Sequence, residues 1–132
     1  MKNLDIANEW FKMAELDFDS AKFLLMNMRP APLEIVCYHC QQCAEKYLKG
    51  FIALNGGQII KTHDLVILNK NCLMYSGKCQ EIENDCMELT DYGVQMRYPF
   101  HLEVEEIDVK KAIESTEKII ELIKKESIRL EK

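Results

Sequence analysis

The stretch from Val36 to Leu54 restricts the possible folds of this chain more than any other. When successive residues are turned by about 100°, as in an α-helix, its apolar side chains share one broad arc and its polar side chains share the other. The apolar arc holds Val36, Cys37, Cys40, Cys43, Ala44, Tyr47, Leu48, Phe51 and Leu54. The polar arc holds Tyr38, His39, Gln42, Glu45, Lys46 and Lys49. We predict a central helix from about Leu33 to Asn55, roughly 34 Å long, with one face buried.

The polar arc and Gly50 each allow two interpretations. The polar arc is either solvated, as on most helices of small bundles, or built to meet a polar group. Gly50 costs roughly 1 kcal/mol relative to alanine in a helix interior. That cost indicates either close packing of another helix at Gly50 or a local weakness in the central helix. The pattern alone decides neither question.

Length and composition favour a helical domain. The chain has 132 residues, of which 48% are hydrophobic, enough for one domain with a single core. Five glycines and three prolines are too few for the turns of an all-β fold. Residues 4–28 repeat apolar side chains on one helical face, and Asp108 can begin a last helix whose end, from Lys124, is expected to fray. These patterns predict an all-α fold over residues 1–132, an up-and-down four-helix bundle with an additional short helix.

Two further helical patterns lie in the middle of the chain. The Thr62 hydroxyl can cap a short third helix that starts near His63, and Asp64 complements the dipole of that helix. We interpret His63 as a capping and packing residue rather than a catalytic one, because no Ser or Cys nucleophile accompanies it in a known motif. A continuous fourth helix is predicted from apolar spacing in steps of three and four, through Cys79, Ile82, Cys86, Leu89, Gly93 and Met96.

Asp17 is out of place on the first helix. It falls inside the apolar arc, between Trp10 and Leu24, where an unpaired carboxylate is costly. We therefore predict that Asp17 is paired with a polar group from another segment, either Lys46 or His63.

The six cysteines indicate the redox environment in which the protein is expected to work. The first residues lack the apolar core of a signal peptide, so the simplest interpretation is free thiols in a reducing, cytoplasmic environment. Cys37, Cys40 and Cys43 all turn towards the apolar arc, which favours buried structural thiols over metal ligands. We predict no metal and no cofactor. No run approaches the ~20 apolar residues of a membrane span.

Few residues of this sequence form a recognisable catalytic or ligand-binding motif. The sequence contains no P-loop, no Gly-x-Ser-x-Gly motif, no paired zinc ligands and no dinucleotide fingerprint. A net charge of −5 argues against a broadly basic nucleic-acid-binding surface, so any contact with phosphates must be local. Arg97 and His101 remain, at the predicted end of the fourth helix. An arginine can stabilise charge on a phosphate, and a histidine can move a proton.

Four motifs, taken in order, resemble those of the HEPN domain family. Ala14, Asp17, Phe18 and Ala21 resemble the start of its first helix. Residues 40–50, CQQCAEKYLKG, resemble its QQAAEKALKA signature, and residues 61–65 match its KTHDL motif. Residues 97–99 match its RYP motif. The resemblance covers most of the chain and implies a bundle of HEPN type.

The resemblance also implies function. It implies a module that binds a nucleotide or RNA, forms a homodimer, and acts with a separately encoded minimal nucleotidyltransferase in a toxin–antitoxin-like pair. Candidate ligand-binding residues are His39, Gln42, Lys46, Lys49, His63, Asp64 and Tyr98. The alternative is a metal-independent RNA endonuclease. HEPN ribonucleases use an Arg followed after four to six residues by a His across a dimer cleft, whereas three residues separate Arg97 from His101.

Overall fold

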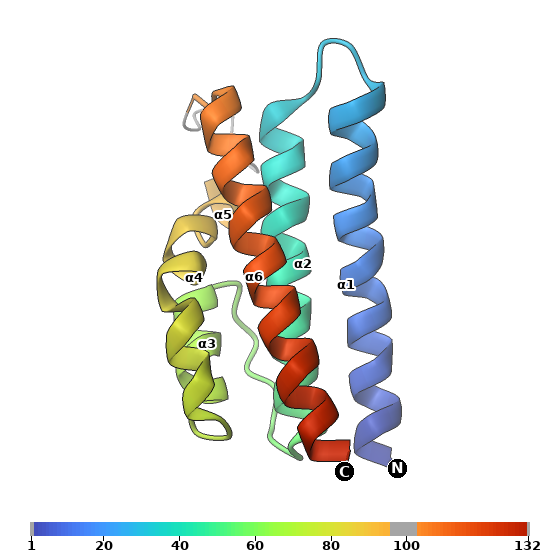
Figure 1. The fold of residues 1–132 in the computed structure, drawn as a ribbon, viewed down its shortest axis with the longest axis vertical. Coiled ribbons are helices and arrows are strands. Elements are labelled where there is room, and N and C mark those ends of the chain that lie inside the picture. The colour runs from blue at the N-terminus through green and yellow to red at the C-terminus, as the bar shows by residue number, and fades with distance from the viewer. Residues whose placement is uncertain (1, 96–102, 132) are drawn as a thin grey trace.

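The computed structural model describes residues 2–95 and 103–131, and within them every regular element is helical. Three helices are long: α1 (Lys2–Asn27), α2 (Leu33–Leu54) and α6 (Glu106–Glu131). The others are short: α3 (Leu65–Leu73), the 3₁₀ helix η1 (Gly77–Ile82), α4 (Glu83–Leu89) and α5 (Tyr92–Gln95). The long helices run side by side, and the short ones lie along the flank of α2 and α6 (Figure 1). The predicted all-α fold is confirmed.

Helix α2 is the centre of the molecule. It packs against each of the other α-helices, and its residues from Val36 to Ala53 are mostly buried. The predicted central helix is therefore confirmed, with bounds that agree to within one residue. Gly56 follows this helix with a φ of 78°, a left-handed conformation that glycine adopts without a steric penalty.

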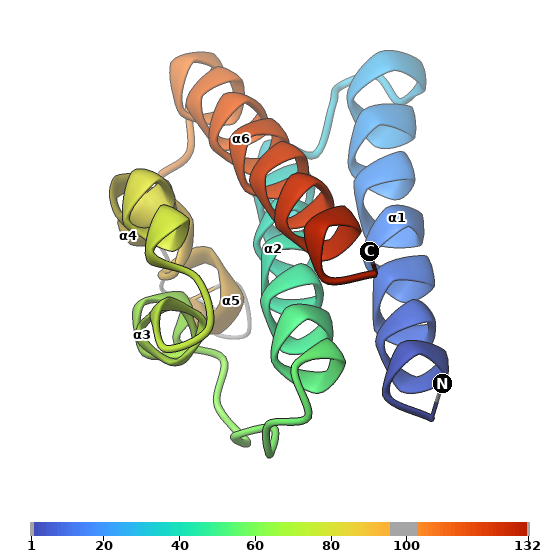
Figure 2. The ribbon, with the colours of Figure 1, turned by 60° about the horizontal axis from the view of Figure 1, so that its bottom comes forward.

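Helix α1 packs mainly on α2, and Figure 2 shows it at the edge of the bundle, on the side of α2 away from α3 and α4. Gly50 allows this contact. A Cβ atom at Gly50 would lie 2.5 Å from the ring atom Cε1 of Phe11 and 3.1 Å from Cβ of Trp10. Close packing of another helix, one of the two interpretations left by the sequence, is thus the correct one.

The predicted fourth helix is not continuous, and this prediction is wrong. The segment forms η1, α4 and α5 in succession, with a break at Thr90 and Asp91 between α4 and α5. The apolar seam still faces inward, since Cys79, Ile82, Cys86 and Leu89 are buried. Short helices in series can keep the same inward spacing, which is why periodicity did not reveal the break.

The charged end of the last helix, which the sequence predicted to fray from Lys124, is helical as far as Glu131. Glu126 and Ser127 are buried, and the Ser76 hydroxyl donates a 2.7 Å hydrogen bond to the Glu126 carboxylate. This contact ties the end of α6 to the start of η1.

All six cysteines are buried and have free thiols, so their interpretation as structural core residues is confirmed. Cys37, Cys40 and Cys43 lie on α2, and the others lie on α3, η1 and α4. None of the helices in the described part of the chain is long and apolar enough to cross a membrane.

The packing at Gly50 gives a stability prediction. Gly50→Ala would gain up to ~1 kcal/mol in helix propensity, but its methyl group would overlap the Phe11 ring and force α1 away from α2. Overpacking of this kind typically costs about 1–3 kcal/mol. We expect a net loss of stability in urea unfolding, and a partial recovery in the double variant Gly50→Ala, Phe11→Leu. A stabilised Gly50→Ala protein would show that α1 does not pack this closely.

Candidate functional site

Two polar networks occupy the face of α2 that the sequence marked as polar. We call the first the Asp17 network; it consists of Asp17, His39 and Lys46. One Asp17 oxygen lies 3.0 Å from Nδ1 of His39, and the other accepts a hydrogen bond from the Lys46 ammonium. The predicted pairing of Asp17 with Lys46 is confirmed. The alternative partner, His63, was wrong, and His39 is a second partner that the sequence did not indicate.

The second, the Glu45 network, consists of Gln41, Glu45, Lys49 and His63. The residue Glu45 is only 4% exposed. Its Oε2 accepts from the Lys49 ammonium at 3.0 Å, and its Oε1 accepts from the Gln41 amide at 3.1 Å and lies 3.0 Å from Nδ1 of His63. Lys49 also lies over the Trp10 ring, 5.6 Å from its centroid.

These donors decide the charge state of Glu45. Burial alone would raise the pKa of its carboxyl group, because a low-dielectric environment disfavours the charged form. The hydrogen bonds from Lys49, His63 and Gln41 outweigh burial and hold the pKa below its ordinary value of 4.5. Glu45 is therefore an ionised carboxylate inside the bundle at neutral pH.

The loop before α3 fixes the position of His63. The Gln41 amide donates to the His63 carbonyl at 3.0 Å. Asp64, not Thr62, is the cap of α3, since its carboxylate accepts from the backbone amides of Val66 and Ile67. The Thr62 hydroxyl instead accepts from the Asp64 amide at 3.1 Å, so the predicted Thr62 cap is wrong by two positions.

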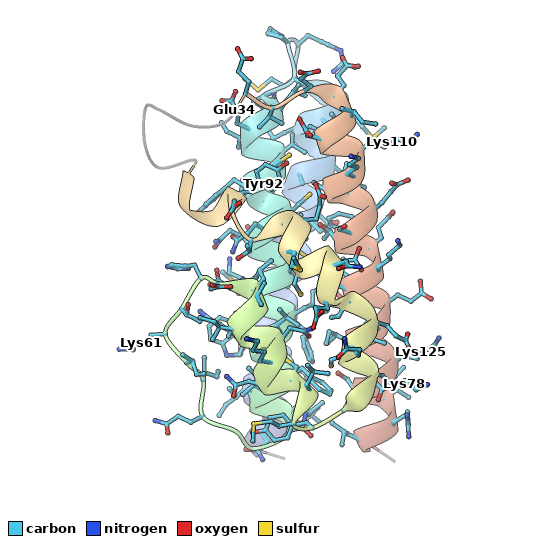
Figure 3. All side chains as sticks on the ribbon, turned by 90° about the vertical axis from the view of Figure 1, so that its left-hand side faces the viewer. Glu34, Lys61, Lys78, Tyr92, Lys110 and Lys125 are labelled. Carbon is cyan, nitrogen blue, oxygen red and sulfur yellow. The ribbon has the colours of Figure 1, made fainter. Side chains whose placement is uncertain are left out.

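A third segment reaches the Glu45 network through Gly93 of α5. A Cβ atom at Gly93 would lie 2.4 Å from the amide carbon of Gln41, so glycine lets the α5 backbone approach this side chain. Gly93 lies four residues before Arg97 in the sequence. Figure 3 shows the flank of the molecule on which α5 and the loop before α3 lie, with Lys61 on the outside of that loop.

The predicted site residues are divided between the two networks. His39 and Lys46 belong to the first, and Lys49 and His63 to the second. Gln42 donates to the Gln41 side chain at 2.8 Å, which links it to the second network. Asp64 is a helix cap. Arg97, Tyr98 and His101 lie outside the residues that the structure describes.

Sequence reasoning missed Gln41, Glu45 and Gly93 as members of the site. Gln41, Glu45 and Lys49 follow one another at intervals of four, and this spacing places polar side chains on one helical stripe. The spacing of four is visible in the sequence, but periodicity cannot show that another segment covers this polar stripe. Among residues 2–95 and 103–131, no group of three or more His, Cys, Asp or Glu side chains is placed to hold a metal ion.

Comparisons with known proteins identify the family and the fold. The family model for the HEPN domain matches residues 7–127, so the chain belongs to the HEPN domain family. Two solved structures have a similar fold. ST0689, an archaeal HEPN homologue, has a TM-score of 0.71 and 23% identity, with 92% of this chain and 97% of that chain covered. TT1696 from Thermus thermophilus has a TM-score of 0.77 and 21% identity, with 90% and 96% covered. The search of curated proteins found no match.

The ionised Glu45 predicts a pH-dependent stability. Because the folded-state pKa of Glu45 is lowered, its contribution is fully present above its unfolded pKa and is lost as pH falls through the folded pKa. Glu45→Gln should therefore cost about 3–5 kcal/mol at pH 7, since it leaves Lys49 buried without its counter-charge. The difference from the unmodified protein should shrink below about pH 4.

Urea unfolding between pH 7 and pH 3 measures this difference. Glu9→Gln, at an exposed position on α1, is the matched control and should track the unmodified protein. A Glu45→Gln deficit that is the same at every pH would contradict an ionised Glu45.

Proposed function

We propose that this HEPN domain binds a nucleotide or an RNA segment, in the cytoplasm, through the surface around the Glu45 network. The observation that carries the proposal is that three segments distant in sequence converge there. Gln41 contacts His63 and approaches Gly93, and these residues come from α2, from the loop before α3 and from α5. A bundle core needs no such polar junction, because buried polar groups add desolvation costs that apolar packing avoids.

The position of Gly93 supports a role for Arg97 in the same site. Arg97 follows Gly93 by four residues in the sequence, and a segment of that length spans at most about 14 Å. An arginine offers a planar fork of donors that matches phosphate geometry. The Lys46 and Lys49 ammonium groups already have carboxylate partners, so Arg97 is the cation that we assign to the phosphate.

The charge balance supports a local contact rather than an extended one. With a net charge of −5, the chain is not suited to many simultaneous phosphate contacts. Each phosphate that is neutralised adds about one unit to the slope of log affinity against log salt concentration, slightly less for single strands. Binding through Arg97 alone should therefore show a shallow salt dependence.

A second candidate function is metal-independent cleavage of RNA, with Arg97 and His101 acting across a dimer cleft. One structural observation favours it over binding alone. The surface already holds a partly exposed histidine whose Nδ1 faces a buried carboxylate, an arrangement suited to proton transfer.

A panel of variants separates the two functions. If the domain only binds, Arg97→Ala should weaken the affinity for a short single-stranded RNA, whereas His101→Ala has little effect. If it cleaves, both variants should lose RNA cleavage in the presence of a chelator. Arg129→Ala is the control, because Arg129 is exposed and its partner is Glu126 in its own helix. Unchanged binding and cleavage in Arg97→Ala would remove the Arg97 assignment.

We further propose that the chain forms a homodimer and that its partner is a separately encoded minimal nucleotidyltransferase, as the family resemblance implies. Native mass measurement tests both. The chain alone should have twice its 15.4 kDa at micromolar concentration, and co-expression with a small nucleotidyltransferase encoded beside it should add the mass of that protein. A monomer alone would contradict the dimer, and unchanged mass on co-expression would contradict the partner.

A further inference from the structure

We propose that His63 is the general base of RNA cleavage by this domain, in place of the histidine that follows the arginine. The inference rests on the cleavage of RNA proposed above, and it changes one outcome of that panel: with His63 as the base, His101→Ala should retain cleavage. A base at His63 does not require the four to six residues that separate the Arg and the His of HEPN ribonucleases. It assigns a catalytic role to a side chain that the sequence analysis interpreted as a capping and packing residue and, by resemblance, as a ligand-binding one.

The hydrogen bond to Glu45 sets the tautomer of His63. A carboxylate can only accept, and Glu45 is held ionised by Lys49 and Gln41. In the neutral ring, Nδ1 must therefore carry the proton that is shared with Glu45 across 3.0 Å. The lone pair is then on Nε2, which has no partner among the described residues, and the side chain is 45% exposed. A neutral imidazole in this state is ready to accept a proton from a bound substrate.

The backbone around His63 is held on both sides. Gln41 fixes the His63 carbonyl, and the Leu65 amide donates to the Thr90 hydroxyl at 2.9 Å. The adjacent Asp64 caps α3. A base must sit within a few tenths of an ångström of its working position, and these bonds supply that restraint from α2, α3 and the turn after α4.

His39 provides an internal comparison. Its Nδ1 also faces a carboxylate at 3.0 Å, that of Asp17, which is shared with Lys46. His39 is less exposed, at 26%, and belongs to the network between α1 and α2. His63 differs because its carbonyl is bound by Gln41, the residue that Gly93 approaches. Of these two histidines, His63 is thus the more exposed one and the one that belongs to the junction of α2, α5 and the loop before α3.

The proposed step balances without a metal or an oxidant. Nε2 of His63 takes the proton of a ribose 2′-hydroxyl, and O2′ forms a bond to the adjacent phosphorus. The bond from phosphorus to O5′ breaks, and O5′ takes a proton from a water molecule. The proton on His63 then neutralises the hydroxide that is left. The products are a 2′,3′-cyclic phosphate and a free 5′-hydroxyl, and His63 returns to its starting state.

His63→Asn is the sharpest test, because the asparagine amide nitrogen takes the place of Nδ1 and can still donate to Glu45, whereas Nε2 is lost. We expect cleavage of a single-stranded RNA in chelator to fall by about 10²-fold or more, as for loss of a general base. Arg129→Ala, at an exposed position on α6, is the control and should stay within a few-fold of the unmodified protein. An RNA with a 2′-deoxy sugar at the cleaved position should resist cleavage.

A second measurement leaves the Glu45 contact in place and does not depend on the folding of a variant. Diethylpyrocarbonate acylates exposed imidazole nitrogens, and mass spectrometry locates the adduct. The extent of modification at His63 should parallel the loss of cleavage in the unmodified chain. Cleavage that persists in protein fully modified at His63 would overturn the proposal.

The remaining outcomes separate this inference from the proposed function. If His63→Asn cleaves like the unmodified protein while Arg97→Ala and His101→Ala do not, the domain is a ribonuclease and the base is not His63. If the unmodified protein leaves RNA intact, both the cleavage function and the role of His63 are wrong, and the affinity measurements alone decide the binding function.

Discussion

The ionised carboxylate of Glu45, buried inside the bundle, constrains more of this structure than any other group. A buried charge is tolerated only when donors surround it, and here they come from three positions: Gln41 and Lys49 on α2 and His63 in the loop before α3. Two of these donors have a second contact. Lys49 lies over Trp10 of α1, and Gln41 binds the His63 backbone and lies against Gly93. One charge thereby ties α1, α5 and the loop before α3 to the central helix.

In the Asp17 network, too, a carboxylate is neutralised by donors from another helix, here between α1 and α2. Its carboxylate belongs to the outer helix and both of its partners to the central one, so it fixes how α1 is rotated and shifted along α2. Gly50 sets how close the two helices come. The polar face of α2 is thus divided into two halves, and each half is neutralised from inside the chain. A ligand bound there, as proposed above, would meet oriented side chains whose charges are already balanced, which suits specific recognition better than general electrostatic attraction.

Much of this could be predicted from sequence, for identifiable reasons. The arcs of the central helix are wide, so its existence, bounds and buried face followed from periodicity alone. Asp17 was placed correctly by an energetic argument, because a carboxylate on an apolar arc demands a partner. The argument could not choose between Lys46 and His63, since periodicity contains no information on how helices are rotated against each other. Glu45 was assigned to the polar arc for the same reason, and its burial depends on a loop whose course the sequence does not reveal.

The break at Thr90 shows a different limit. Spacing in threes and fours describes one long helix and several short ones equally well, and the hydroxyl of Thr90 accepts a hydrogen bond from Leu65, on α3, which is remote in sequence. Such a contact is specified by the tertiary structure and not by the local pattern.

The six buried thiols have a practical consequence for studies of this protein in solution. Thiolates, not thiols, react with alkylating reagents, and burial raises the pKa of Cys40 to about 11 and that of Cys37 and Cys86 to about 12. These groups do not react as long as their helices stay packed. Because they are distributed over α2 and α4, the rate at which each is labelled reports how often its own helix opens. The buried thiols are thus native probes of local unfolding, and the packing that buries them also holds the polar face in position.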